Sequence, residues 1–253
     1  MSLSVVIITK NEEDIIGMCL DAIAALSDDV IIVDSGSTDD TEVICISKNA
    51  RFFPHGWEGY SKNKNFGIEQ AKHDWVLSID ADEILNSELV SAIQKELRAP
   101  AFDAYDISFK NVFLGKALNY GSWVRESHIR LFKKKNIRWE GDIHEKLTLG
   151  AARIGKLNGH ILHYSIRSLE QYISKKNIYT TLAAEDMYSR GKKAGFVKIF
   201  LSPVFHFLRD YVIKLGFLDG LQGFVLAAES AHYVYLKYSK LSLLQKHITF
   251  VKK

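Results

Sequence analysis

The 253-residue sequence predicts an α/β fold, in which helices flank a mostly parallel sheet and a helical extension follows at the C-terminus. Three observations support this fold class. Short apolar runs at residues 4–9, 30–33 and 75–79 have the length and composition of buried strands. Helical patterns separate them, and strands that alternate with helices pair in parallel through right-handed crossovers. Beyond residue 164, apolar and aromatic residues recur mainly at helical spacing.

The first half of the chain begins with a strand that is apolar on both faces, as central strands of parallel sheets are. Residues 11–14 then open a helix with an N-cap residue and an acidic first turn. The second strand, residues 30–33, runs into a polar turn at residues 34–40, and Thr41 begins another helix. This order predicts that the two strands are parallel neighbours.

The third strand, residues 75–79, ends in the carboxylates Asp80, Asp82 and Glu83. Side chains alternate along an extended backbone, so Asp80 and Asp82 point the same way. Neighbouring carboxylates repel unless a cation lies between them or one is protonated. Mg²⁺ or Mn²⁺ would relieve this repulsion and keep coordination sites for phosphate oxygens. The alternative is an acidic turn before the helix that residues 86–88 would cap.

The polar residues that follow the three strands are expected to form one site. In open parallel sheets, ligands bind outside the carboxyl ends of the strands. Residues 9–12, 34–39 and 80–83 all fall at that edge. Lys62 and Lys64 precede the third strand and could offset the charge of a bound diphosphate. The alternative for these two lysines is a solvated helix start.

These segments resemble family 2 glycosyltransferases of the GT-A type. The matching residues are 4–12, 33–39 and the Asp-x-Asp motif at 80–82, within a resemblance that covers roughly the first 150 residues. The resemblance implies a nucleoside diphosphate sugar donor, with Asp82 as the main ligand of a divalent metal, Mg²⁺ or Mn²⁺. It also implies that the nucleotide sugar contacts Thr9, Asn11, Glu12, Asp34, Ser35, Asp80 and Ala81. Lys62 and Lys64 join these candidates because of their charge.

One departure from the family pattern concerns the nucleotide base. Many relatives carry two aspartates where this chain has Asp34 and Ser35. The usual second carboxylate to a uracil ring is therefore missing, which leaves the base open, although a UDP-hexose is favoured. By resemblance, Asp34 lies near the base and the ribose.

A candidate catalytic base follows in the segment 139–145. An inverting transfer needs a carboxylate that removes a proton from the acceptor hydroxyl. Many relatives carry a Glu-Asp pair here, whereas His144-Glu145 resembles the His-Glu version of bacterial lipopolysaccharide-core transferases. The resemblance implies Glu145 as base and His144 as a metal or phosphate neighbour, with Asp142 as second candidate base. The alternative is a solvated strand pair with a buried histidine. Trp123 and Trp139 are candidates for stacking on a sugar or for the core.

Charge divides the chain into two predicted domains. Residues 165–253 carry 14 Lys and Arg against 6 Asp and Glu, a net charge of +8, whereas residues 1–164 carry −5. A basic, aromatic region suits a nucleic acid or an anionic membrane. We expect a peripheral membrane surface and no nucleic acid, with packing on the body or an oligomer interface as alternatives. High salt would release the protein from the membrane, because it screens the basic residues that contact anionic lipid. These residues are Lys192, Lys193, Lys198, Arg209 and Lys214.

The remaining features predict the compartment. Cys19 and Cys45 lie in apolar patterns without metal-type spacing, as reduced core residues of a cytosolic protein do. The first apolar run is too short for a signal peptide, and no charge-free segment reaches membrane-spanning length. We therefore expect a cytoplasmic protein at the cytoplasmic face of the inner membrane.

Together these features predict an inverting, metal-dependent glycosyltransferase. It would move a hexose, with glucose favoured, from a nucleoside diphosphate sugar to a lipid-linked saccharide such as the lipopolysaccharide inner core. One alternative is a nucleotidyltransferase on a sugar phosphate, although residues 9–12 are not the Gly-rich basic loop of that class. The other is a non-catalytic membrane-docking module whose acidic cluster is structural.

Overall fold

The computed structural model describes residues 2–135, 137–141 and 145–246, apart from the side chain of Arg125. The chain forms two compact units. Unit 1 comprises Met1–Lys110 and Arg125–Tyr164, and unit 2 comprises Asn111–Val124 and Ser165–Lys253. The charge pattern predicted one domain for residues 1–164, whereas residues 111–124 group with unit 2 in the structure.

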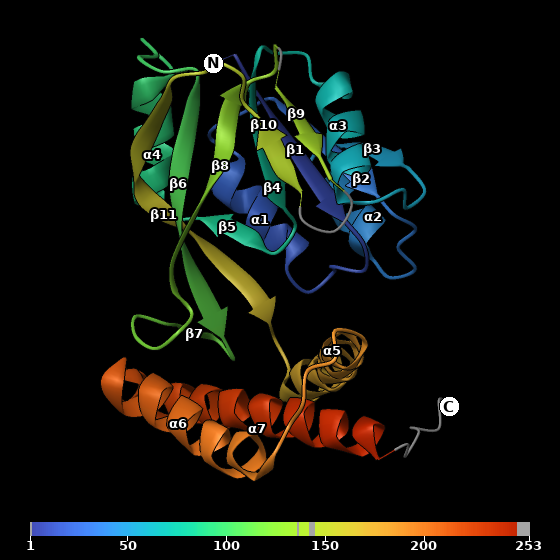
Figure 1. The fold of residues 1–253 in the computed structure, drawn as a ribbon. Helices are drawn as coiled ribbons and strands as arrows, with labels where there is room; N and C mark the ends of the chain where they lie inside the picture. The colour runs from blue at the N-terminus through green and yellow to red at the C-terminus, as the bar shows by residue number, and fades with distance from the viewer. Residues whose placement is uncertain (1, 136, 142–144, 247–253) are drawn as a thin grey trace. The chain divides into compact units, whose positions relative to one another are not determined.

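Four parallel strands form the part of the unit 1 sheet that bears the predicted site (Figure 1). Their order across the sheet is β3-β2-β1-β4; the strands are β1 (Leu3–Thr9), β2 (Asp29–Asp34), β3 (Arg51–Pro54) and β4 (Trp75–Asp80). Every residue of β1 is buried, as expected for a central strand. Thr9 pairs with Asp34 and Ile8 with Asp80, so the three polar clusters lie along one edge.

The sheet continues beyond β4 in the order β8-β6-β11-β5. These strands are β5 (Glu83–Leu85), β6 (Ala104–Phe113), β8 (Val124–Lys133) and β11 (Ile154–Ile166). β8 is antiparallel to β4, with Leu131 opposite Leu77, and β5 is antiparallel to β11. A separate antiparallel pair, β9 (Arg138–Glu140) and β10 (Lys146–Thr148), carries the segment predicted to hold the base.

Hydrophobic cores cover both faces of the parallel strands. Side chains alternate along β1, so Val5 and Ile7 join one buried cluster while Val6 and Ile8 join another. The helices of unit 1 are α1 (Ile16–Ile23), α2 (Thr41–Ser47), α3 (Tyr60–Gln70) and α4 (Ser87–Glu96). The first cluster includes buried residues of α1, α2 and α4. Asn86 caps α4 by accepting a hydrogen bond from the amide of Leu89.

Helix α3 lies directly on the sheet, because glycine occupies the closest approach. A Cβ at Gly67 would lie 2.4 Å from Val6 Cγ1 and 2.9 Å from Val33 Cγ2. This close packing fixes the N-terminal half of α3 beside the carboxyl edge of the strands, where Asn63 and Lys64 are fully buried.

Unit 2 is mainly helical, as predicted for the C-terminal extension. Its long helices are α5 (Leu169–Ser189) and α7 (Gly220–Gln245). α6 (Ser202–Leu208) lies between two π-helical turns and runs beside α7 (Figure 1); the other elements are β7 (Lys116–Ala117), η1 (Val197–Leu201), η2 (Arg209–Ile213) and η3 (Gly216–Asp219). Tyr172 of α5 and Leu226 of α7 share a small core.

We find no single helix in the described part of the chain with the length and apolar character needed to cross a membrane. The bent pair formed by Val197–Ile213 and Gly216–Gln245, with 69° between its halves, meets the same test when taken together.

Candidate active site

The first two polar clusters are joined into one loop surface at the carboxyl ends of β1 and β2. Asp34 accepts hydrogen bonds from the amides of Gly36 and Ser37, at 2.9 and 2.8 Å, and from the Ser37 hydroxyl at 2.5 Å. Asn11 has a left-handed φ of 54° and accepts a 2.8 Å bond from the amide of Thr38. Both oxygens of Asp34 therefore shape the turn that the sequence placed near the base and ribose.

Thr9 and Glu12 belong to the same surface and were also predicted to contact the nucleotide sugar. The Thr9 hydroxyl is buried and has no hydrogen-bond partner among the described residues. The amide of Glu12 donates to Thr41 Oγ1 at 2.9 Å, which ties the loop after β1 to the start of α2. A buried hydroxyl without a partner is costly, so Thr9 is a candidate for a ligand contact.

Asn63 is a residue that the sequence patterns did not single out. Its Nδ2 donates to Ser35 Oγ at 3.2 Å, and its Oδ1 accepts from the amide of Glu58 at 3.1 Å. These bonds connect α3 with the loop after β2 and with the segment that precedes α3. The only sequence signal was an amide side chain between two lysines at the beginning of a helix.

Of the two predicted lysines, only Lys64 reaches the carboxylates. Its Nζ lies 3.2 Å from Asp80 Oδ1 and 3.2 Å from Glu145 Oε1, and 4.7 Å from the centre of the Trp139 ring. The two carboxylates and the ring offset the cost of burying its ammonium group. Lys62 is exposed and lies 3.8 Å from Glu58 instead.

A buried ion pair that the sequence did not reveal supports Asp80. Arg130 of β8 binds both oxygens of Glu83, at 2.5 and 3.0 Å, and its Nη2 lies 3.6 Å from Asp80 Oδ2. Burial alone would raise the pKa of Asp80, but Lys64 and Arg130 lower it. Burial and the nearby Asp80 raise the pKa of Glu83 to about 6, although Arg130 opposes this shift. Asp80 is therefore held as a charged group between two cations.

Asp82 lies in a different environment from Asp80. Ala81 between them is buried, and Asp82 Oδ2 lies 3.4 Å from Nε2 of His163, a β11 residue that no motif indicated. Burial lowers the pKa of His163, but the hydrogen bond to Asp82 and the surrounding carboxylates raise it overall. Neither of the two cations that bind Asp80 has a contact with Asp82, which leaves this carboxylate available to a ligand.

Glu145, the predicted base, lines a cavity of about 740 Å³ in unit 1. Arg130 and Trp139 also line this cavity, and its other polar lining residues include Asp106, Ser127, His128, Lys146 and Lys156. Asp142 and His144 lie outside the described residues. Trp123 lies in unit 2, where its ring contacts Phe113 and Tyr172.

The possible metal ligands at this site suit a metal ion that binds together with a nucleotide. The described residues hold no group of three or more His, Cys, Asp or Glu arranged around a metal position. Mg²⁺ often uses only one or two protein carboxylates, with phosphate oxygens and water as its other ligands. Asp82, with His163 beside it, fits that smaller requirement. Its assignment as a metal ligand stays a prediction.

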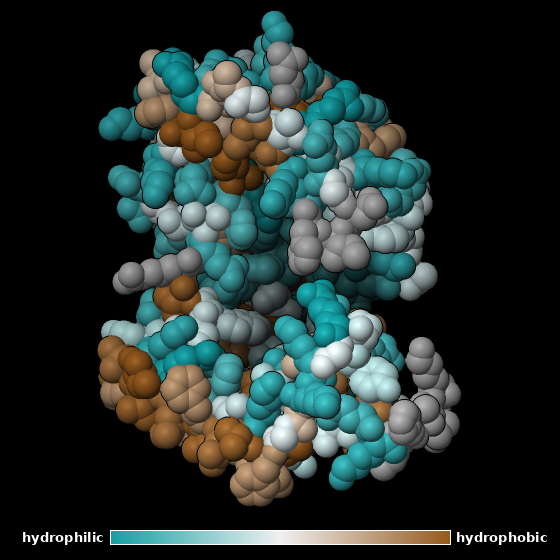
Figure 2. Space-filling model, in the orientation of Figure 1, coloured by the Kyte–Doolittle hydropathy of each residue, from teal (hydrophilic) through white to brown (hydrophobic). Residues whose placement is uncertain are grey.

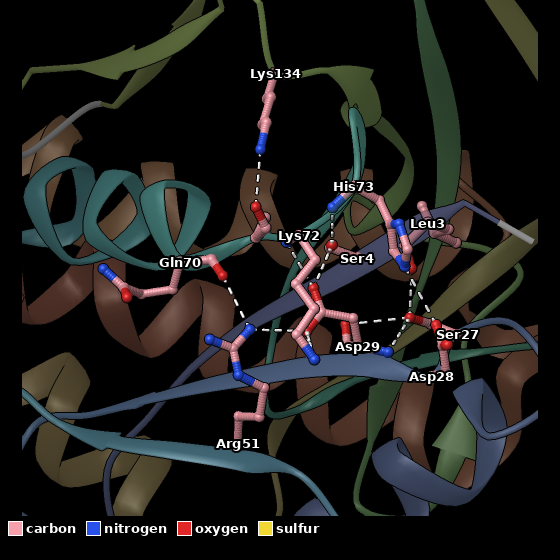
Figure 3. A network of polar contacts seen from close by, with 11 residues as sticks. Leu3, Ser4, Ser27, Asp28, Asp29, Arg51, Gln70, Lys72, His73 and Lys134 are labelled. Carbon is pink, nitrogen blue, oxygen red and sulfur yellow. Dashed lines mark hydrogen bonds and ion pairs between the residues drawn. The ribbon is translucent and has the colours of Figure 1, made fainter.

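A second buried carboxylate network lies at the opposite, amino end of the same strands (Figure 3). Asp29 is buried and accepts hydrogen bonds from Ser4 Oγ at 2.5 Å, the Lys72 amide at 2.9 Å and Arg51 Nη1 at 2.8 Å. Burial raises the pKa of Asp29, but these bonds outweigh it and lower the pKa. All of these donors come from the protein, so the network is structural.

The fold is similar to that of a solved structure. A mycobacterial protein of known crystal structure superposes with a TM-score of 0.50 over 72% of this chain and 74% of its own, at 20% identity, which shows the fold alone. This is the GT-A fold of glycosyltransferases.

The sequence comparisons then specify the family. The family model described as Glycosyl transferase family 2 matches residues 4–154, and the chain belongs to this family. The lipopolysaccharide core biosynthesis glycosyltransferase LpsC of Rhizobium meliloti is 30% identical over 251 residues, covering 95% of this chain and 92% of that protein. An uncharacterised glycosyltransferase of Rickettsia typhi is 32% identical over 94% of this chain and 86% of its own. The chain is a glycosyltransferase, and the predicted resemblance is confirmed.

Proposed function

We propose that this glycosyltransferase moves a hexose, glucose by preference, from UDP-hexose to a lipid-linked saccharide, with inversion at the anomeric carbon and with a divalent metal. The acceptor we favour is the lipopolysaccharide inner core. The relative LpsC supports that acceptor, because this chain spans nearly all of its length.

The observation that carries the proposal is the position of Lys64. Its ammonium group bridges Asp80, at the end of β4, and Glu145, in the wall of the cavity. Inversion by direct displacement needs a leaving group on one side of the sugar and a base on the other. Lys64 therefore connects the end of β4, which would bind the diphosphate, with the carboxylate of Glu145, which faces space for an acceptor.

The donor half of the site would use groups at the strand ends. The Thr9 hydroxyl and the loop shaped by Asp34 face the nucleotide in this proposal, and Lys64 faces the diphosphate. Asp82 would hold the metal with the diphosphate oxygens, and His144 is a further candidate neighbour outside the described residues. When bound, a divalent ion offsets the negative charge that develops on the leaving diphosphate.

The acceptor half of the site would use Glu145 as general base. Its carboxylate takes the proton of the acceptor hydroxyl as that oxygen bonds to the anomeric carbon. The bond from the anomeric carbon to the phosphate oxygen breaks, and the nucleoside diphosphate leaves. Lys64 remains beside the leaving group, where a fixed cation stabilises the charge without reorganisation. Arg130 and Glu83 keep Asp80 in position.

The proposed reaction takes place at a membrane. A lipid-linked acceptor is confined to the bilayer surface, and a cytoplasmic sugar nucleotide is available on its cytoplasmic face. We therefore place the protein peripherally on the cytoplasmic face of the inner membrane. Nucleic acid has no part in this proposal.

A screen of sugar nucleotides tests the proposed function. Purified protein is incubated with UDP-hexoses and with GDP- and ADP-hexoses, in Mn²⁺, in Mg²⁺ or in EDTA, and the released nucleotide is measured. We expect hydrolysis of a UDP-hexose that requires the metal and increases with lipopolysaccharide truncated in the inner core. NMR of the product should show the opposite anomeric configuration. Retention of configuration, or activity that EDTA leaves unchanged, would contradict the proposal.

A further inference from the structure

Unit 2 exposes a continuous apolar surface along the helix formed by η1 and α6. Six of its side chains are each between 53% and 71% exposed; they are Phe196, Val197, Phe200, Leu201, Val204 and Phe205, and we call them the apolar stripe. Their repeat of four residues keeps them on one helix face. In Figure 2, hydrophobic side chains gather over the part of unit 2 that contains α6 in Figure 1. A patch of this kind marks an interaction surface.

The opposite face of α6, together with the turn η2 that continues it, is already packed. The rings of Phe207 and Tyr211 contact Phe224 of α7, with centroids 5.8 and 5.6 Å apart. Asp210 is buried and accepts a 2.8 Å bond from Ser230 of α7. The helix therefore has a fixed orientation on α7, and within the described residues the apolar stripe faces outward.

Basic residues flank the apolar stripe. Lys192 and Lys193 precede it, Lys198 lies within it, and Lys214 follows it, all exposed. Lys198 is turned back, because its Nζ donates to the carbonyl of Lys193 at 2.9 Å. Apolar side chains bordered by lysines match the interface of an anionic bilayer, where acyl chains meet phosphates. A second copy of the chain would present the same positive border, so two stripes would repel at their edges.

We propose that the apolar stripe inserts into the interface of an anionic lipid bilayer, with the η1–α6 helix lying in the membrane plane. The proposed function includes a peripheral membrane location. The insertion rests on that proposal and adds the surface through which the protein binds the bilayer. Insertion depends on unit 2 and sugar transfer on the site in unit 1, so either can fail while the other holds.

Insertion of apolar side chains changes the expected effect of salt. The sequence predicted reversible docking through basic residues together with buried aromatic side chains, with release at high salt. In the structure, Arg209 is bound to both oxygens of its neighbour Asp210, at 2.7 and 3.0 Å, and is less available to lipid. Salt screens the exposed lysines but not the burial of phenyl rings. Binding should therefore weaken at high salt without being lost.

Flotation with lipid vesicles tests the insertion. The full-length protein is mixed with vesicles of phosphatidylcholine and phosphatidylglycerol at low and at high salt and centrifuged through a density step. Wild type should float under both conditions. The triple variant Phe196→Ser, Phe200→Ser, Phe205→Ser should lose about a thousandfold in binding, since each of the three phenyl rings contributes about tenfold. The variant Lys192→Glu, Lys193→Glu should bind more weakly than wild type at low salt and about as well as wild type at high salt, where the charges are screened.

Matched controls separate loss of insertion from loss of structure. Val43→Ser with Ile46→Ser removes two comparably exposed apolar side chains from α2 in unit 1 and should leave flotation unchanged. The triple variant should keep the wild-type melting temperature and donor hydrolysis, because the replaced side chains are exposed. Wild type that does not float, or a triple variant that floats as well as wild type, would overturn the proposal. The proposal would also be overturned if wild type formed a dimer and did not bind vesicles, and if the triple variant were monomeric.

Discussion

Two buried carboxylate networks lie at opposite ends of the same parallel strands, and they differ in how their charges are balanced. At the amino end, Asp29 is bonded by Ser4, Arg51 and the amide of Lys72. At the carboxyl end, the cations Lys64 and Arg130 contact three carboxylates, which are Asp80, Glu83 and Glu145. A fourth carboxylate, Asp82, lies beside His163.

The difference shows what distinguishes a site from a structural network. Both ends contain an aspartate whose pKa is lowered, Asp29 fully buried and Asp80 half-buried, so a shifted pKa does not identify the function. The carboxyl end has more acids than cations, and one of its acids, Glu145, lines a cavity. Excess negative charge beside open space is what a metal-bound diphosphate and an acceptor hydroxyl would use.

The largest expected effect is that of Glu145→Gln. The amide cannot accept the proton of the acceptor, so kcat should fall by roughly 10²- to 10⁴-fold, while the dissociation constant of the donor stays close to wild type. Steady-state kinetics and calorimetry measure the two quantities. Glu140→Gln, at an exposed position of β9, is the matched control. If Asp142→Asn gave this profile and Glu145→Gln did not, Asp142 would be the base.

Asp29→Asn should have the opposite profile. The substitution breaks a buried ion pair and should cost about 3 kcal/mol of unfolding free energy, measured in urea. Because the network lowers the pKa of Asp29, its stabilisation is present above the ordinary value of 3.8 and is lost as pH falls through the lower folded value. The variant should therefore lose less stability on acidification. Its kcat/KM should match wild type below the melting temperature, and a selective loss of activity would refute the comparison.

Lys64→Met removes the cation that bridges the two halves of the site. A charge-assisted hydrogen bond contributes about 1.5–3 kcal/mol, so donor affinity should fall roughly tenfold to a hundredfold. Titration with UDP in the presence of Mn²⁺ measures this loss. Lys62→Met, on the exposed side of the same helix, should leave affinity within twofold, roughly the effect of an exposed ion pair. Equal losses in both variants would mean that Lys64 acts only through net charge.

Gly67→Ala tests the close packing that holds α3 against the strands. The added methyl group would overlap Val6 and Val33, and overpacking should cost about 1–3 kcal/mol of unfolding free energy. Gly17→Ala in α1 meets side chains only at ordinary contact distances of 3.7 and 3.8 Å, so it should be neutral or slightly stabilising. Chemical denaturation of both variants gives the comparison, and a neutral Gly67→Ala would show that α3 moves freely.

Much of the fold could be predicted from local patterns. The parallel strands, the helices between them and the helical extension each have a hydrophobic period that is visible in the sequence. The edge that gathers residues 9–12, 34–39 and 80–83 follows from parallel pairing alone. Residues 60–70 also form a helix, and neighbours two apart on a helix point roughly 200° apart. That geometry explains why Lys64 reaches the site and Lys62 does not.

The remaining site residues depend on contacts between distant segments. Arg130 and His163 come from β8 and β11, whose places in the sheet no local pattern sets. Asn63 and Glu83 are polar residues that become important only through their partners. In unit 2, residues 196–215 are apolar on several sides, so the sequence could not tell that Phe207 faces α7 while Phe200 faces outward.

The most direct test of the proposed donor site is calorimetric binding of UDP to wild type and to Asp82→Asn, with Mn²⁺ and with EDTA. Wild type should bind UDP far more tightly with Mn²⁺. Asp82→Asn should bind UDP in EDTA as wild type does and gain little from Mn²⁺, with an unchanged melting temperature. Asp21→Asn, at an exposed position of α1, should behave as wild type. A folded Asp82→Asn variant that keeps the full Mn²⁺ dependence would contradict the assignment of Asp82 and the account built on it.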